Sequence, residues 1–127
     1  MYPEIKIENA EIESTMLGNE DHGIFTCYVT VSGEGWGCGF GGYALDAYDK
    51  EQKRRIGTAY GLEFIKRILE TLEIERWEKL KGTPVRVETE GLGGGIKRLG
   101  HFKKNRWFDP KELAAEFEKE PKCIPTP

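Results

Sequence analysis

The chain has 127 residues, of which 38% are apolar and 32% are charged, and its formal net charge is −3. This size suits one domain with a single core, and no apolar run reaches the roughly 18 residues of a membrane span. The acidic N-terminus lacks a signal-peptide layout, and the odd cysteine count (Cys27, Cys38 and Cys123) favours neither a disulfide framework nor a zinc site. We therefore expect a cytosolic protein without a metal, a cofactor or a membrane partner.

The charges are distributed unevenly along the chain. Residues 1–49 carry nine acids and one base, a net charge of −8, whereas residues 50–127 carry 18 bases and 13 acids, a net charge of +5. Such asymmetry can steer a charged partner towards the protein, or it can draw the two halves of one domain together. The sequence alone leaves both interpretations open.

The N-terminal third has the pattern of β-strands. Isoleucine recurs among polar residues over 5–12, as in a half-buried strand, with a break near Asn9-Ala10. Residues 18–23 have the composition of a turn, and residues 24–31 are rich in β-branched and aromatic side chains. Together these segments predict a β-hairpin.

A glycine tract follows, with glycine at every odd position over 33–41 and Trp36, Cys38 and Phe40 in between. An extended chain would therefore have one bare face and one face that carries these side chains. Bare faces often accept a close neighbour, so we expect packing under a helix or against a second subunit. The alternative is a ligand or partner groove lined by Trp36, Phe40 and Tyr43. The tract also matches G-x-G-x-x-G, but no helix follows it directly, as a dinucleotide site requires.

The most regular predicted element is a helix over 58–72, which Thr58 can cap. Its apolar side chains recur at helical spacing and predict one buried stripe: Leu62, Ile65, Ile68, Leu69 and Leu72. We interpret residues 49–55 as a charged connector before this helix, and residues 75–80 as a further helical turn after it.

The last third predicts a second hairpin and a second helix. Residues 84–102 alternate on both sides of a glycine-rich turn and read as a hairpin. Asp109 is placed as an N-cap, Pro110 as the first helical residue, and Glu112 as the partner in a capping box.

This order of elements predicts an α+β fold with a mainly antiparallel sheet. Two hairpins and a glycine-rich strand would pack on one long helix, with a second short helix near the C-terminus. We assign residues 1–120 to a single domain and residues 121–127 to an extended tail.

The second hairpin leads into a basic stretch that contains five full positive charges, a histidine and no acid. We refer to these residues as the basic stretch: Lys97, Arg98, His101, Lys103, Lys104 and Arg106. Trp107 and Phe108 follow, and positive charge beside aromatic side chains is typical of sites that bind single-stranded nucleic acid. An acidic protein surface would suit the stretch equally well, and the alternative is a solvated hairpin edge with both aromatics in the core.

No catalytic constellation is evident, and we predict no catalytic residue. A nucleophilic Cys27 or Cys38 that meets His101 in space is one alternative, although buried cysteines on strands are far commoner. Glu88 and Glu90 could form a carboxylate pair, but exposed strand faces commonly carry glutamates.

Four segments resemble a family of small phage and prophage proteins, and the resemblance covers about residues 5–117. They are IENAEIESTMLG (7–18), EDHGI (20–24), GFGGYALD (39–46) and RWFDPKEL (106–113). The family offers no assigned chemistry or functional residues to transfer. The resemblance implies that the chain acts by binding, since short phage proteins without catalytic motifs are often inhibitors of host defence, anti-CRISPR proteins among them.

The leading hypothesis is a non-enzymatic phage protein that blocks a host defence protein or nucleoprotein complex in the host cytoplasm. The basic stretch, Trp107 and the aromatics of the glycine tract are the candidate contacts. The alternative contact is an acidic face of Glu8, Glu11, Glu13, Glu20 and Asp21. A nucleic-acid-binding accessory protein is the second hypothesis, a small cysteine enzyme is the third, and a homodimer is compatible with each.

Overall fold

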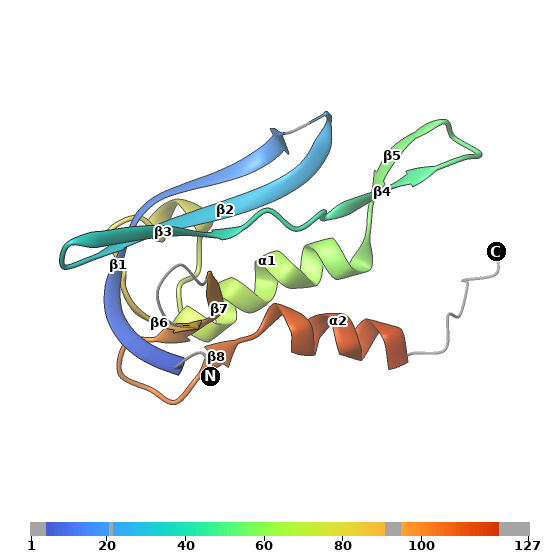
Figure 1. The fold of residues 1–127 in the computed structure, drawn as a ribbon. Coiled ribbons are helices and arrows are strands. Elements are labelled where there is room, and N and C mark those ends of the chain that lie inside the picture. The colour runs from blue at the N-terminus through green and yellow to red at the C-terminus, as the bar shows by residue number, and fades with distance from the viewer. Residues whose placement is uncertain (1–4, 21, 91–94, 120–127) are drawn as a thin grey trace.

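The computed structural model describes residues 5–20, 22–90 and 95–119, which form a mixed α/β fold with a mainly antiparallel sheet and two helices (Figure 1). The predicted tail at 121–127 and residues 91–94 of the glycine-rich turn lie outside the described residues. The elements in chain order are β1 (Ile5–Glu20), β2 (Ile24–Gly33), β3 (Trp36–Gly41), β4 (Asp46–Asp49), β5 (Arg54–Gly57), α1 (Ala59–Leu72), the 3-10 helix η1 (Trp77–Lys79), β6 (Pro84–Glu90), β7 (Ile96–His101), β8 (Trp107–Phe108) and α2 (Pro110–Lys119).

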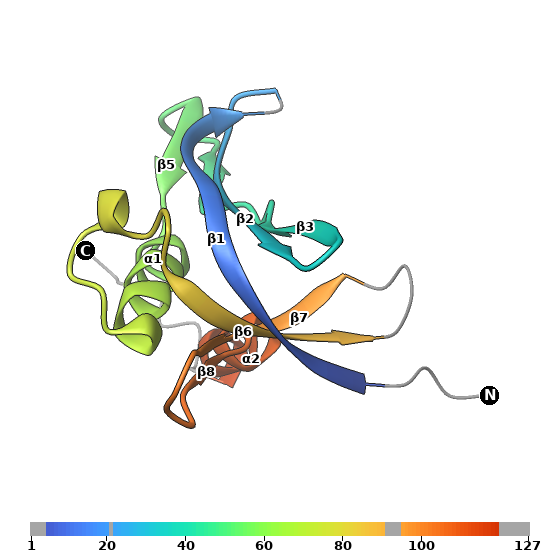
Figure 2. The same ribbon diagram turned by 90° about the vertical axis from the view of Figure 1, so that its left-hand side faces the viewer.

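The main sheet has six strands in the order β3-β2-β1-β6-β7-β8, and each neighbouring pair is antiparallel. β1 belongs to both halves of this sheet, because it pairs with β6 over Ile5–Glu11 and with β2 over Glu11–Glu20 (Figure 2). The predicted break near Asn9-Ala10 is wrong, since the register shift falls between Ile12 and Ser14. The predicted turn also begins later, because pairing with the apolar β2 keeps the polar end of β1 extended to Glu20.

Three phenylalanines connect the sheet to α1. The ring of Phe64 on α1 lies 4.9 Å from that of Phe108 on β8 and 6.4 Å from that of Phe40 on β3, between ring centroids. The rings of Phe40 and Phe108 are 6.0 Å apart in an edge-to-face arrangement. All three side chains are buried, so Phe40 is a core residue and the prediction that it lines a surface groove is wrong.

Most of the predicted stripe of α1 is confirmed, since Ile68 and Leu72 are buried and the half-buried Ile65 and Leu69 pack against the core. The prediction is wrong for Leu62, which is 62% exposed, and it omitted Phe64, which is fully buried. The face that α1 presents to the core is set by Gly61, which lies against the backbone carbonyl of Leu45, where a Cβ atom would collide. A glycine contact of this kind gives no signal in the hydrophobic periodicity that produced the prediction.

The glycine tract forms β3, which is an edge strand of the sheet. Gly37 and Gly39 are exposed, and a Cβ atom at Gly39 would meet nothing within 4 Å. The bare face is therefore open, and the expected packing of that face under a helix is wrong. The dinucleotide motif is also excluded here, because β3 leads into the β4–β5 ribbon and not into a helix.

The predicted charged connector is a two-stranded ribbon, β4–β5, which projects from the body (Figure 1). Asp46 and Arg55 lie near its base, and an ion pair of 2.7 Å joins Asp46 Oδ1 to Arg55 Nη2. Asp49 stabilises the turn, since its carboxylate accepts the backbone N–H of Glu51. An ion pair and turn hydrogen bonds hold this ribbon, so it lacks the apolar alternation by which strands are recognised.

Both predicted helix caps are confirmed. The Thr58 hydroxyl accepts the backbone N–H of Gly61 at 2.9 Å, and the Asp109 carboxylate accepts that of Lys111 at 2.9 Å. The helical turn predicted at 75–80 is also present, as η1. Among the described residues, no helix is long and apolar enough to cross a membrane.

Two glycines of the tract should differ in how strongly substitution lowers stability. Gly41 has a φ of +132°, and a Cβ atom there would collide with the carbonyl of Cys27. We expect Gly41→Ala to lower the free energy of unfolding by at least about 2 kcal/mol, because strained backbone and overpacking combine. Gly39→Ala should change it by less than about 1 kcal/mol. Denaturant unfolding of both variants measures the difference, and equal effects would contradict the register of β3.

Candidate interaction surfaces

The first charges of the basic stretch are neutralised within the second hairpin. Lys97 Nζ lies 2.8 Å from a carboxylate oxygen of Glu90. Arg98 donates two hydrogen bonds, of 3.0 and 2.8 Å, to the carboxylate of Glu88 on the neighbouring strand. These contacts lower the pKa of both glutamates, mainly through the side-chain hydrogen bonds from Arg98 and Lys97. Glu88 and Glu90 are therefore ion-pair partners and do not form a free carboxylate pair.

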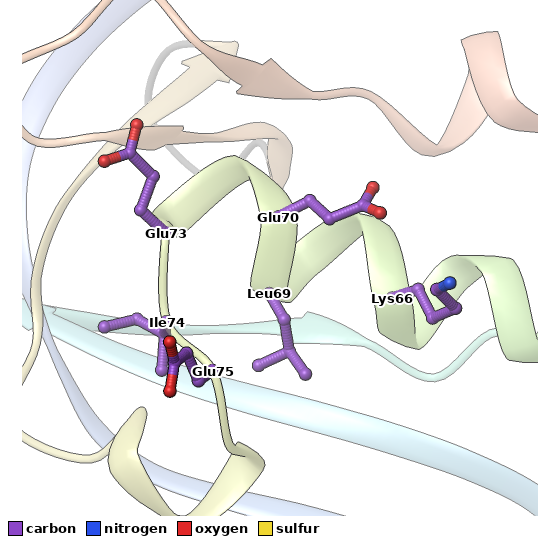
Figure 3. A pocket seen from close by; sticks show the side chains of 6 residues that line it. All are labelled: Lys66, Leu69, Glu70, Glu73, Ile74 and Glu75. Atoms are coloured by element: carbon purple, nitrogen blue, oxygen red, sulfur yellow. The ribbon is translucent and has the colours of Figure 1, made fainter.

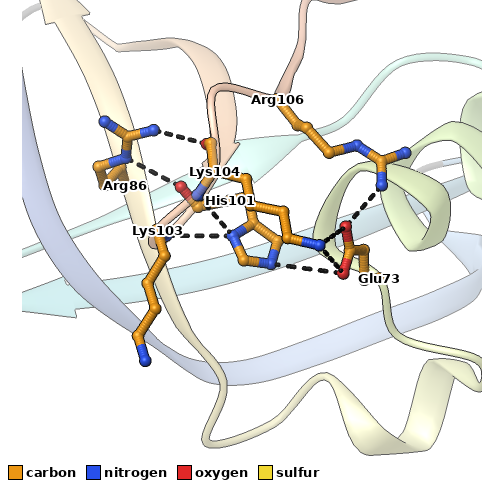
Figure 4. Close-up of polar contacts among 6 residues, drawn as sticks. All are labelled: Glu73, Arg86, His101, Lys103, Lys104 and Arg106. Carbon is orange, nitrogen blue, oxygen red and sulfur yellow. Dashed lines mark hydrogen bonds and ion pairs between the residues drawn. The ribbon is translucent and has the colours of Figure 1, made fainter.

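The later charges of the stretch converge on Glu73, the residue that ends α1 (Figure 4). Its carboxylate accepts hydrogen bonds from Lys104 Nζ, at 2.9 and 2.8 Å, and from Arg106 Nη1 at 2.7 Å. The pKa of Glu73 is lowered, first by the Lys104 hydrogen bond and then by that of Arg106. This cluster fastens the β7–β8 turn to the C-terminal end of α1.

His101 and Arg86 hold the same turn through its backbone. His101 Nδ1 accepts the backbone N–H groups of Lys103 and Lys104, each at 3.0 Å, and its Nε2 lies 4.0 Å from Glu73 (Figure 4). Arg86 donates to the carbonyl oxygens of His101 and Lys104 at 2.9 and 2.8 Å. The imidazole therefore has a structural role, and within the basic stretch only Lys103 lacks a polar side-chain partner among the described residues.

Trp107 is not a free stacking platform. The guanidinium groups of Arg98 and Arg86 lie 4.6 and 4.9 Å from the centroid of its ring. The ring also packs over Gly100, where a Cβ atom would lie 2.6 Å from it. Cation–π contacts of this kind occupy the surface on which a nucleobase would stack, and they explain why Trp107 is half-buried.

The remaining predicted aromatics do not form one groove. Trp36 is half-buried and packs over Gly33, whereas Phe40 is in the core. Tyr43 is 41% exposed and helps to line a hollow of about 210 Å³ together with Lys97. Tyr43 thus lies close to the basic stretch, and its ring is 5.3 Å from that of Phe64 in the core, between ring centroids.

The acids of β1 present the opposite situation. We call these residues the acidic row: Glu8, Glu11, Glu13 and Glu20. Glu11, Glu13 and Glu20 are exposed, Glu8 is half-buried, and none of the four has a basic partner in the described part of the chain. Asp21, the fifth acid named from the sequence, lies outside the described residues.

A groove that the sequence did not predict lies at the end of α1. It has a volume of about 470 Å³, and Leu69 and Ile74 face it from α1 and from the segment that follows (Figure 3). Its charged lining is formed by Lys66, Glu70, Glu73 and Glu75. The sequence over 70–75, Glu-Thr-Leu-Glu-Ile-Glu, has no regular pattern that predicts this groove.

The cysteines provide little support for an enzyme. Burial raises the pKa of the Cys27 thiol to about 12, so the reactive thiolate is scarce at neutral pH. Cys38 is half-buried, and its Sγ lies 3.6 Å from the carbonyl oxygen of Gly39. No group of three or more His, Cys, Asp or Glu side chains that could hold a metal ion occurs within the described ranges.

The ion pairs predict acid destabilisation. The pKa of Glu88 is lower in the folded chain than its usual value of 4.5 because of Arg98, so its stabilising contribution is complete above that value. The contribution is lost as the pH falls through the folded pKa. Glu88→Gln should lower stability at pH 7 and flatten the fall in stability below pH 5, measured by denaturant unfolding from about pH 7 to pH 3. Glu13→Gln is the control, and an identical pH profile for Glu88→Gln and the wild type would contradict the role of this pair.

We compared the chain with protein-family models, with curated proteins and with solved structures, and none of the three comparisons gave a match. No residue role is therefore transferred from another protein, and the resemblance to phage proteins remains an expectation.

Proposed function

We propose that the chain is a non-enzymatic, phage-encoded binding protein that inhibits a host defence system. In this proposal it occupies a basic surface of a defence protein or nucleoprotein complex in the host cytoplasm, as some anti-CRISPR proteins do. The supporting observation is that most charges of the basic stretch form ion pairs within the fold, whereas the acidic row forms none with described residues.

The acidic row suits a basic partner on electrostatic grounds. Glu11, Glu13 and Glu20 are exposed and have no basic partner among the described residues, and like charges on a surface raise the rate of encounter with a surface of opposite charge. Proteins that bind nucleic acid carry such basic surfaces. The row would therefore compete with nucleic acid for the same site, and the competition would weaken at high salt because the charges are exposed.

The nucleic-acid-binding alternative has weaker support. Five of the six residues of the basic stretch have partners inside the fold, and Trp107 carries two guanidinium groups on its ring. A polyanion would first have to displace Glu73, Glu88 or Glu90 from these contacts. The loss of these internal ion pairs offsets much of the electrostatic energy gained by binding the polyanion.

Reversing two charges of the acidic row tests the proposal. Glu11→Lys with Glu13→Lys should abolish the restoration of phage plating that the wild-type chain gives in cells with an active nucleic-acid-guided defence. Both side chains are exposed, so the free energy of unfolding should change by less than about 0.5 kcal/mol per site. The readout is the efficiency of plating on cells that express each variant.

The control has the same change in net charge at exposed acids elsewhere, Glu78→Lys with Glu118→Lys. This control should restore plating as well as the wild type does. If the variant with Glu11 and Glu13 reversed restores plating as well as the wild type does, the acidic row is not the contact surface. Failure of the wild type against every such defence tested would contradict the function itself.

A further inference from the structure

Among the described residues, one stretch of β1 has a neighbouring strand on one side only. Over Ile5–Ala10 its backbone pairs with β6, and the pairing with β2 begins at Glu11. Figure 2 shows this half of β1 at the rim of the fold, away from β2 and β3. An open strand edge presents unpaired N–H and C=O groups, which form a template for another strand.

Four side chains on this stretch are also left exposed or unpaired by the described part of the chain. Ile5 and Ile7 lie on one face and are 58% and 54% exposed. Lys6 and Glu8 alternate with them on the other face, and neither forms an ion pair with a described residue. The fold of one chain thus leaves two large apolar groups and two opposite charges unused on a single open edge.

We propose that this edge pairs with the same edge of a second copy of the chain, in an antiparallel arrangement centred on Ile7. The two strands would be related by a two-fold axis perpendicular to the sheet, as in a symmetric dimer. Ile7 then lies opposite its own copy, and Lys6 of each chain lies opposite Glu8 of the other. Both apolar and charged cross-strand pairs of this kind stabilise a sheet.

Charge repulsion disfavours the two neighbouring registers of this pair. A two-fold axis of this kind always places one residue of β1 opposite its own copy, so the next possible registers are centred on Lys6 and on Glu8. Centring the pair on Lys6 opposes two lysines, and centring it on Glu8 opposes two glutamates. Like charges directly opposite each other destabilise a sheet. The register centred on Ile7 avoids both and opposes Lys6 to Glu8 twice.

This dimer does not rest on the proposed function. Because the two strands run antiparallel, Glu11, Glu13 and Glu20 of the two copies would lie on opposite sides of the centre, and the dimer would form equally in a protein with another role.

The test is charge reversal with rescue, followed by sedimentation velocity over a range of concentrations. The wild type should dimerise as concentration rises. Lys6→Glu and Glu8→Lys should each remain monomeric, because each opposes like charges. An equimolar mixture of the two variants should restore the dimer, since every cross-strand pair is then of opposite charge. Lys81→Glu and Glu78→Lys, at exposed positions outside this strand, are controls that should dimerise like the wild type.

A cysteine at the centre of the edge gives a second readout. Ile7→Cys should form a disulfide-linked dimer under mild oxidation, because directly opposed residues lie about 5 Å apart between Cα atoms. Ile5→Cys should not form a disulfide-linked dimer, because residue 5 would lie opposite Asn9 of the other copy. The oxidised wild type is the control for disulfides formed by the native cysteines. Circular dichroism verifies the fold of each variant. The proposal would be overturned by a wild type that is monomeric at all concentrations, or by a mixture of the two variants that stays monomeric. Lys6 would then be a charge that prevents pairing of this edge with another strand.

Discussion

The contact of Phe64 with Phe40 and Phe108 determines the shape of this fold. Phe40 belongs to β3 and Phe108 to β8, which are the two outermost strands of the six-stranded sheet. The sheet therefore wraps around α1 until its two edges meet on one ring. The bend and the register shift in β1 follow from this closure, because β1 is the strand that both halves share. Edge-to-face aromatic pairs add to the burial of such large side chains.

This closure also decides which charges are available for binding. Once Phe64 fixes α1 against the sheet, Glu73 at the end of the helix meets the turn between β7 and β8. The basic stretch is then required to hold that turn, and its charges are neutralised by acids from the same half of the chain. Among the described residues, the pair of Asp46 with Arg55 is the one ion pair that includes an acid of the N-terminal half. The charge asymmetry in the sequence therefore survives in the folded molecule in the acidic row on β1, of which Glu11, Glu13 and Glu20 are exposed.

Elements specified by local chemistry could be predicted from the sequence. The caps at Thr58 and Asp109 depend on residues within three positions, and the hairpin over 84–102 has clear alternation. The mixed fold and antiparallel sheet followed from the order of these elements. The ribbon β4–β5 and the two-residue β8 were missed, because one is held by polar contacts and the other is too short for a pattern.

The candidate site was harder to predict because its contacts are distant in sequence. Glu73 and Lys104 are 31 residues apart, and composition counted Lys104 as free charge. The sequence likewise favours Trp107 as a binding residue, whereas in the fold the guanidinium of Arg86, on another strand, lies over its ring. The acids of the acidic row could be named from the sequence. Only the structure shows that they have no basic partners among the described residues, which distinguishes the row from a neutralised surface.

Fluorescence anisotropy with two labelled probes, single-stranded DNA and polylysine, is the most direct test that the acids and not the bases are free to bind. At low salt, the chain should bind polylysine with an affinity that falls as salt is added, and it should bind the DNA weakly or not at all. Tight, salt-sensitive binding of the DNA together with no binding of polylysine would contradict the assignment, because the basic stretch would then have to release Glu73 and Glu88 at little cost.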